Sequence, residues 1–392
     1  MPLLQAPGSG LSALPPLSLY IHIPWCIQKC PYCDFNSHRL KPDTDEAAYV
    51  NALLADLQHE LPHIWGRPVD TIFIGGGTPS VFSAESISRL LSGVRALVRL
   101  QPEAEITLEA NPSTFEQARF QGYAEAGITR LSLGIQSFDN AKLQALGRIH
   151  NGDEARAAIE AALAIFPRVN TDLMYALPHQ TPEEARRDAE TALSFGVTHI
   201  SAYHLTMEPN TPFGRTPPPG IPEEDAAYTI EQTVHHTLLA AGFEHYETSA
   251  FAKNGQQCRH NLNYWQYGDY LGIGAGAHSK QTRDGIISRS SKYRAPGAYQ
   301  KAAGNEQNPY RDQRFTVPRD EQPFEIMMNA LRLKDGIPTA YLHERSALTL
   351  DDLRPTLARL IAQGLIDPAI EQRLKTTERG FALLNNVLDA FL

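Results

Sequence analysis

Short apolar runs alternate with longer segments of helical periodicity from about residue 17 to residue 251. The short runs are rich in Val, Ile and Leu and are bounded by turn residues, which predicts strands. Between them, apolar positions recur every three or four residues, which predicts amphipathic helices. The predicted strands cover residues 19–23, 71–74, 105–110, 130–136, 170–174 and 199–205. The predicted helices include residues 46–61, 84–98, 115–126 and 182–195.

Capping residues support this division of the chain. Ser83, Ser113 and Thr181 stand where a side-chain oxygen can accept from first-turn amides, and Gly127 and Gly196 are placed to end helices. Six strand–helix units in series predict a parallel sheet with right-handed crossovers, either doubly wound or curved into a barrel. In both cases a binding site is expected at the carboxyl ends of the strands.

The pattern also divides the chain into parts. Residues 211–222 are too rich in proline for a strand or helix and are expected to form a crossing loop or lid. Residues 280–320 are polar and irregular and are expected to wrap the surface. The predicted parts are an N-terminal extension (1–16), the strand–helix core (17–252), accessory strands and loops (253–322) and a small C-terminal domain (323–392).

The C-terminal part has the pattern of a small winged-helix-like domain. Thr349 can cap a helix that ends before Gly364, with Pro355 as a potential kink. A strand is expected over residues 374–377, and Gly380 precedes a last apolar helix. Winged helices often bind DNA, but the charges here are mixed and form no basic stripe. A packing or docking role is therefore expected.

Composition narrows the class of protein. At about 150 residues per domain, the 392 residues allow two or three domains, or one large α/β unit with an appendage. The net charge of −9 argues against a dedicated nucleic-acid binder. Residues 1–19 contain four prolines and no basic residue, unlike a signal peptide, and no run approaches about 18 apolar residues. We expect a cytoplasmic protein, with peripheral contact to a membrane left open.

Three of the four cysteines lie close together, directly after the first predicted strand. Cys26, Cys30 and Cys33 have the spacing C-x3-C-x2-C. Thiolates suit iron–sulfur clusters or zinc. Three of them can hold a [4Fe–4S] cluster and leave one iron open to chelate the amino and carboxylate groups of S-adenosylmethionine (SAM). The alternative is a structural zinc site with Cys258 or His260 as fourth ligand, which accounts poorly for the position at a strand end.

A glycine loop follows the second predicted strand. Gly75, Gly76 and Gly77 remove every side chain there, so the backbone can approach a ligand and offer amide groups to it. Polar residues also stand at the ends of the later strands. They are Glu109, Asn111, Gln136, Ser137, Asp172, Tyr203 and His204. Each alone could be a hydrogen-bonded turn residue, but the series predicts a site at the mouth of a barrel.

With these motifs the chain resembles radical SAM proteins of the coproporphyrinogen III oxidase-like family over nearly its whole length. The resemblance implies an α/β fold: a partial (β/α)6 radical SAM barrel with extra strands and a small winged-helix-like domain. It implies that Cys26, Cys30 and Cys33 hold the [4Fe–4S] cluster. The residues implied to contact SAM are Tyr20, Tyr32, Gly76, Gly77, Thr78, Glu109, Gln136, Arg148 and Asp172.

One position separates the subfamilies. The oxygen-independent oxidases have a further cysteine two positions after the third, where this chain has Phe35. This difference and the motif HNxxYW, from His260 to Trp265, are similar to the HemW-type heme chaperones. That group binds heme and transfers it to acceptor proteins, with membrane-bound respiratory enzymes among the candidates. It is not expected to decarboxylate coproporphyrinogen.

The resemblance also implies where heme would bind. His260 could ligate the iron while Tyr264 or Trp265 packs against the macrocycle, with Cys258 as a weaker ligand. Residues 280–314 hold eight basic and three acidic side chains, some of which could pair with heme propionates. The structural alternative is that His260 and Asn261 cap a turn and Trp265 lies in the core.

Three other functions stay open on the sequence. One is the oxidative decarboxylation of coproporphyrinogen III in porphyrin biosynthesis, against which Phe35 argues. Another is a radical enzyme with an unrelated substrate, because the motifs constrain the cofactor far better than the substrate. The last is an interaction protein stabilised by zinc. We assign no catalytic residue from the sequence.

Overall fold

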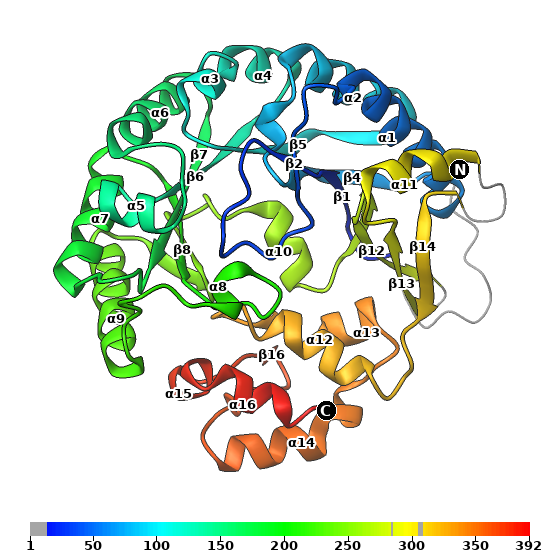
Figure 1. Cartoon of the computed structure of the whole chain (residues 1–392). Helices are drawn as coiled ribbons and strands as arrows, with labels where there is room; N and C mark the ends of the chain where they lie inside the picture. Colours follow the sequence, from blue (N-terminus) through cyan, green and yellow to red (C-terminus); the bar gives the residue numbers. More distant parts are fainter. Residues whose placement is uncertain (1–13, 284, 305–308) are drawn as a thin grey trace.

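Twelve strands of the described residues form one curved sheet, around which the molecule is built (Figure 1). The computed structural model describes residues 14–283, 285–304 and 309–392. Six central strands run parallel and follow one another in chain order, so the predicted series of strand–helix units is confirmed. They are β1 (Leu17–Ile23), β4 (Pro68–Gly76), β5 (Arg99–Ala110), β6 (Arg130–Gln136), β7 (Arg168–Tyr175) and β8 (His199–His204).

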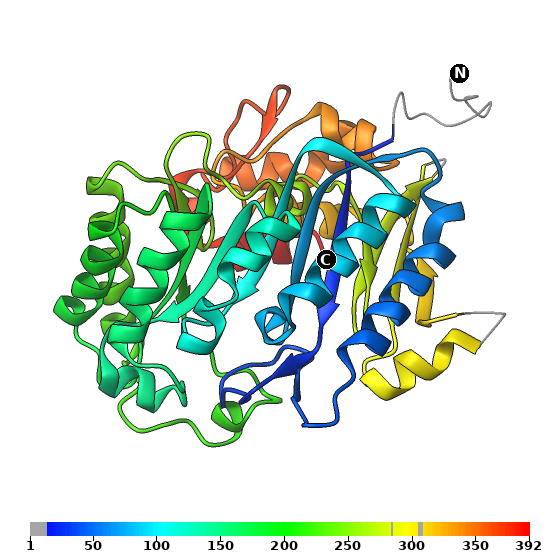
Figure 2. The same cartoon turned by 90° about the horizontal axis from the view of Figure 1, so that it is seen from above.

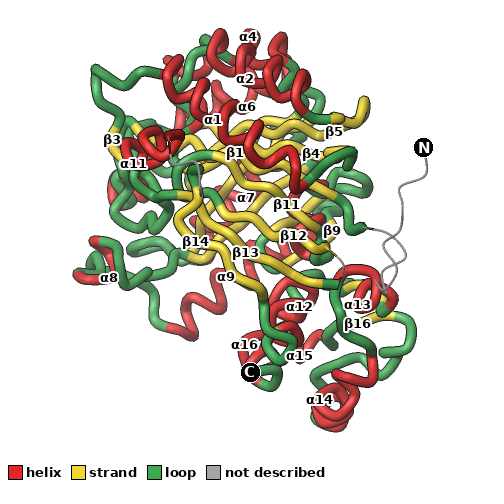
Figure 3. The backbone as a smooth tube through the Cα atoms, turned by 90° about the vertical axis from the view of Figure 1, so that its right-hand side faces the viewer, coloured by secondary structure: helices red, strands yellow, loops and turns green. Residues whose placement is uncertain are grey.

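The crossover helices cover the convex face of the sheet, along the outer rim of Figure 1 and above the sheet in Figure 3. Side chains on this face are apolar, and in β6 Leu131, Leu133 and Ile135 are completely buried. Because the sheet curves and stays open, the fold is the predicted partial barrel and not a doubly wound sheet. The helices are α1 (Glu46–Glu60), α2 (Ala84–Leu97), α3 (Thr114–Gln117), α4 (Phe120–Ala126), α5 (Asn140–Ala145), α6 (Gly152–Ile165), α7 (Pro182–Ser194) and α9 (Glu224–Ala240).

The inward positions of the same strands are mostly polar. In β6 they are Arg130, Ser132, Gly134 and Gln136, which alternate with the buried leucines and isoleucine. Barrel interiors of this kind are usually filled by branched apolar side chains. The polar interior therefore indicates a binding cavity and not a packed core.

Further strands extend the sheet at both edges. β11 (Asp269–Ile273) pairs in parallel with β1, and β12 (His278–Arg283), β13 (Ile286–Lys292) and β14 (Arg311–Thr316) continue it antiparallel. The expectation that residues 280–320 wrap the surface irregularly is therefore wrong. Lysines occupy the buried positions Lys280 and Lys292, so the apolar alternation that marks a strand is missing. At the other edge, β10 (Ala250–Ala252) and β9 (Glu244–Glu247) follow β8.

Two helical predictions also needed correction. Residues 115–126 form two short helices, α3 and α4, instead of one. The carboxylate of Glu116 is buried, accepts a hydrogen bond from Ser80 and accepts another from the Asn111 amide at 2.6 Å, which ties this turn to the neighbouring loop. The proline-rich crossing loop contains one helical turn, α8 (Pro212–Arg215).

The C-terminal domain closes the β9 edge of the sheet. Leu333 forms a bridge with Glu247, and the Lys334 amide donates to the Tyr246 carbonyl at 3.1 Å. Thr349 makes the predicted capping box with Asp352. Figure 3 shows these helices on the opposite side of the sheet from α2 and α4. The elements are α12 (Gln322–Ala330), β15 (Ile337–Pro338), α13 (Ala340–Arg345), α14 (Leu350–Ala362), β16 (Arg373–Leu374), α15 (Glu378–Ala382) and α16 (Leu384–Asp389).

A buried ionic network joins the accessory strands to the barrel. Lys292 of β13 is 1% exposed and contacts Asp56 and Glu60 of α1 at 2.5 and 2.7 Å. Arg311 of β14 adds a second cation, with its Nη2 2.7 Å from Glu60. Burial raises the pKa of Glu60, but Lys292 and Arg311 outweigh it and lower the pKa to about 2. Among the described residues, no helix is long and apolar enough to cross a membrane.

We expect Lys292→Met to destabilise the fold strongly. It would leave the Asp56 carboxylate buried without its cation, which typically costs about 3–5 kcal/mol. Urea unfolding measures this change. The control is Arg354→Met on α14, which removes a solvent-exposed ion pair with Glu371. It should leave the free energy of unfolding in urea almost unchanged. Equal stability of wild type and Lys292→Met would contradict the prediction.

Candidate functional site

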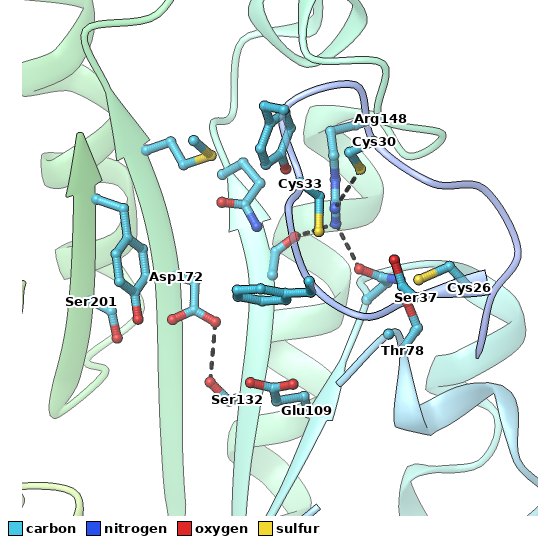
Figure 4. A pocket seen from close by; sticks show the side chains of 18 of the residues that line it. Cys26, Cys30, Cys33, Ser37, Thr78, Glu109, Ser132, Arg148, Asp172 and Ser201 are labelled. Atoms are coloured by element: carbon cyan, nitrogen blue, oxygen red, sulfur yellow. Dashed lines mark hydrogen bonds between the residues drawn. The ribbon is translucent and has the colours of Figure 1, made fainter. Parts of the chain in front are cut away.

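A cavity of about 340 Å³ opens at the carboxyl ends of the parallel strands, as the sequence predicted. Figure 2 shows the loop after β1 and helix α8 together at this end of the strands. The cysteine loop forms the mouth and the inward strand residues form the walls and floor (Figure 4). The predicted site residues that line it are Cys26, Cys30, Tyr32, Cys33, Gly77, Thr78, Glu109, Gln136, Arg148 and Asp172.

The three predicted cluster ligands all line this cavity. Cys26 is buried, Cys30 and Cys33 are partly exposed, and all three are free thiols. Burial raises the pKa of the Cys33 thiol to about 11, and binding to a metal ion would lower it. Among the described residues, no group of three or more His, Cys, Asp and Glu side chains is placed to hold a single metal ion.

The cysteine loop is held from three sides. Its β2 (Trp25–Cys26) pairs with β3 (His38–Arg39), and the Phe213 amide of α8 donates to the Pro31 carbonyl at 3.0 Å. The Asn36 side chain donates to the carbonyls of Ala275 and Arg294, at 2.9 Å each. The crossing loop and the accessory strands thus both position the thiols.

The glycine loop packs against the start of the cysteine loop. A Cβ on Gly77 would lie 2.6 Å from the Trp25 carbonyl oxygen, so only glycine allows this approach. The amides of Gly76, Gly77 and Thr78 donate to Glu109, Ile23 and Trp25. These amides are therefore used within the protein, in contrast to the expectation that they are offered to a ligand.

Arg148 connects the cysteine loop to the strands. Its Nη1 lies 3.4 Å from the sulfur of Cys30, and its Nη2 donates to Asn111 and to the Gly134 carbonyl at 2.7 and 2.8 Å. Figure 4 shows the guanidinium between the loop and the strand ends. Arg148 can therefore orient Cys30 as well as contact SAM.

Two carboxyl groups, those of Glu109 and Asp172, line the cavity within electrostatic range of each other. Glu109 accepts from the Gly76 amide at 3.2 Å, and Asp172 accepts from Ser132 and Asn170 at 3.1 and 2.8 Å. Burial and the nearby Asp172 raise the pKa of Glu109 to about 8. Burial also raises the pKa of Asp172. Both groups can accept hydrogen bonds from the ribose hydroxyls of SAM.

Several residues of the floor were not identified from the sequence. Phe73, Arg130, Ser132 and Asn170 line the cavity below the predicted residues, and Asn261 closes it from α10 (Arg259–Trp265). The alternation of polar and apolar residues along whole strands would have indicated them. The sequence prediction used only the polar residues at the strand ends. Tyr20 and Gly76 lie behind the wall: the Tyr20 hydroxyl is 2.9 Å from His22.

The structure contradicts the expectation that His260 ligates heme iron. Helix α10 lies inside the curve of the sheet (Figure 1), and His260 is completely buried. Its Nδ1 lies 2.8 Å from Thr71 Oγ1 and its Nε2 lies 2.9 Å from the Tyr264 hydroxyl, so neither nitrogen is free for iron. Trp265 packs against Arg332 of the C-terminal domain.

Cys258, the weaker predicted heme ligand, is also unavailable. It is completely buried, and its sulfur lies 3.6 Å from Glu105 Oε1. Cys258 and His260 were the fourth ligands of the zinc alternative, but neither lines the cavity and both have other partners. The donor set at the mouth is thus three thiols, which fits a cluster with one open iron.

We expect Glu109→Gln to change how stability depends on pH. The folded protein holds the Glu109 proton up to about pH 8 and the unfolded chain loses it near 4.5, so stability falls as the pH rises between these values. The variant should lose that part of the slope, keep the part from Asp172, and be more stable than wild type by about 1–3 kcal/mol at pH 8. Urea unfolding of the cofactor-free protein at pH 5 and pH 8 measures this.

The exposed Glu190 on α7 provides the matched control, since Glu190→Gln should leave the pH dependence unchanged. If Glu109→Gln and wild type had parallel curves between pH 5 and pH 8, Glu109 would be ionised in the fold and the prediction would fail.

Comparisons with known proteins show which family the chain belongs to. Residues 20–192 match the model of the radical SAM superfamily, and residues 317–383 match the HemN C-terminal domain. The solved structure of coproporphyrinogen III oxidase (HemN) from Escherichia coli superposes with a TM-score of 0.80 over 96% of this chain and 90% of that chain. At 23% identity this likeness shows the fold alone.

Two relatives are similar over almost the whole chain. The chain is 48% identical to heme chaperone HemW of Escherichia coli (strain K12), over 97% of this chain and 99% of that protein. It is 47% identical to heme chaperone HemW of Haemophilus influenzae, over 97% of this chain and 98% of that protein. The chain therefore belongs to the HemW family within the radical SAM superfamily.

Proposed function

We propose that this protein is a heme chaperone, which binds heme and transfers it to acceptor proteins. The observation that carries the proposal is the identity of nearly half, along the whole chain, to proteins named heme chaperones. Phe35 supports it from within the chain. It lines the cavity mouth, 58% exposed, at the position where an oxidase would have a further thiol.

The radical SAM match brings a [4Fe–4S] cluster and SAM as cofactors. When bound, the cluster would supply an iron to which the methionine end of SAM could bind. In our proposal Cys26, Cys30 and Cys33 hold the cluster, and Arg148 orients Cys30. Glu109 and Asp172 bind the ribose from the cavity wall.

The place of action and the acceptor belong to the same proposal. We infer that the protein works in the cytoplasm, where clustered thiols stay reduced. The acceptors to try first are membrane-bound respiratory enzymes, with contact at the membrane surface.

Anaerobic purification followed by heme titration tests the function. We expect about four iron and four sulfide per chain, saturable heme binding seen as a shift of the heme absorption, and loss of that heme to an apo-acceptor. If the protein decarboxylated coproporphyrinogen III and transferred no heme, its function would be that of an oxidase and the chaperone proposal would be wrong. A colourless zinc protein without sulfide would contradict both.

Exchange of single cysteines tests the cluster ligands. We expect Cys33→Ser to lose most of the iron and sulfide, because it removes one of three thiolates at the cavity mouth. Cys258→Ser is the matched control, since this buried thiol lies beside Glu105 and away from the mouth. Equal loss of iron in both variants would show that Cys258 is a ligand and refute the assignment.

A further inference from the structure

The end of the cysteine loop meets the β11–β12 turn and the chain after β13. The Asn36 side chain bridges both, through the carbonyls of Ala275 and Arg294. Its neighbour Phe35 presents a largely exposed ring at the cavity mouth. β12 starts at His278, three residues after Ala275. Asn36 thus joins the backbone next to an exposed aromatic ring to two segments that are far away in the chain, one near His278 and one at Arg294.

His278 differs from His260 in being accessible. It is exposed, and within the described part of the chain its ring makes no hydrogen bond. Partial burial, and then the cations Arg289 and Arg294, lower the pKa of His278 below its usual value. A neutral imidazole with a free nitrogen is the form that binds iron. His278 therefore has the accessibility that His260 lacks.

The basic residues between 280 and 314 are not equally available to an anion. Lys280 is buried against Asp269, Lys292 is buried between Asp56 and Glu60, and Arg289 is paired with Glu325. Arg294 is exposed, and no hydrogen bond from its guanidinium is found in the described residues. A propionate could bind Arg294 without displacing a carboxylate.

His204 is the competing histidine. It is exposed at the end of β8 and lines the cavity, with its ring against Tyr175. The cavity that His204 lines also contains Glu208, whose carboxylate would repel a propionate. His278 has arginines within electrostatic range instead. Charge complementarity to an anionic macrocycle therefore favours His278.

We propose that heme docks on the patch formed by Phe35, His278 and Arg294, with His278 as an axial ligand of the iron. Phe35 packs against the macrocycle and Arg294 binds a propionate. This inference rests on the proposed function and names where that function takes place. The patch adjoins the cysteine loop but leaves the interior of the cavity to SAM.

The test is a titration of the cluster-loaded protein with heme. We expect His278→Ala to weaken heme binding about tenfold or more and to change the absorption of the bound heme, because an iron ligand is lost. Free imidazole should restore the absorption in this variant. Iron and sulfide content should stay at the wild-type level. Unchanged affinity and absorption in His278→Ala would overturn the assignment.

Arg294→Ala separates the propionate contact from a general effect of charge. It should weaken the binding of heme about tenfold but leave the binding of heme dimethyl ester unchanged, because the ester has no carboxylate. An equal loss for both probes would remove Arg294 from the site. Phe35→Ala should weaken both probes alike, and unchanged binding of both would remove Phe35.

Matched histidine controls complete the test. His343→Ala on α13 removes another exposed histidine and should change nothing. His204→Ala should also bind heme normally, and a loss there with none in His278→Ala would place heme at β8 and refute the patch. If wild type binds no heme, the proposed function itself fails. If wild type binds and His278→Ala binds equally, only this inference fails.

Discussion

Three thiols on a short loop must keep a fixed spacing although the loop has no core of its own. The structure meets this constraint with anchors from distant parts of the chain. Phe213 holds the middle of the loop through Pro31, and Asn36 holds its end through Ala275. Gly77 lets the next strand end pack directly beneath it. The positions of the three sulfur atoms thus depend on the crossing loop, the accessory strands and the glycine loop.

The same strands must present polar groups to the interior without losing stability. Their apolar side chains are buried on the outer face of the sheet. Their charged side chains form ion pairs with groups of opposite charge inside the barrel. Arg168 pairs with Glu105 at 2.5 Å, and α10 supplies His260 to Thr71. Because α10 fills the lower part of the barrel, the cavity has a floor and remains small. The HNxxYW motif is thus part of the barrel's internal hydrogen bonding.

The sequence predicted the central strands well because their outer faces are strictly apolar, as in Leu131, Leu133 and Ile135. It failed for β12–β14, where Lys280 and Lys292 occupy buried positions and their counter-ions lie far away in the chain. The three cysteines stood out as candidate ligands from their C-x3-C-x2-C spacing. The role of His260 was not evident, because only the fold shows that both of its nitrogens have partners. A local sequence pattern shows the periodicity of a helix or strand. It does not show ion pairs or hydrogen bonds between residues that are far apart in the chain.

The position of Phe35 connects the two halves of the site. It stands two residues after Cys33 and one before Asn36, whose single amide nitrogen donates to both Ala275 and Arg294. Because one nitrogen makes both bonds, a shift of the cysteine loop would carry the Arg294 backbone with it. The Asn36 side chain thus links the backbone of the cysteine loop to the backbone at Arg294. Substitution of one thiol by an exposed ring would then change both the ligand set of the loop and the surface next to it.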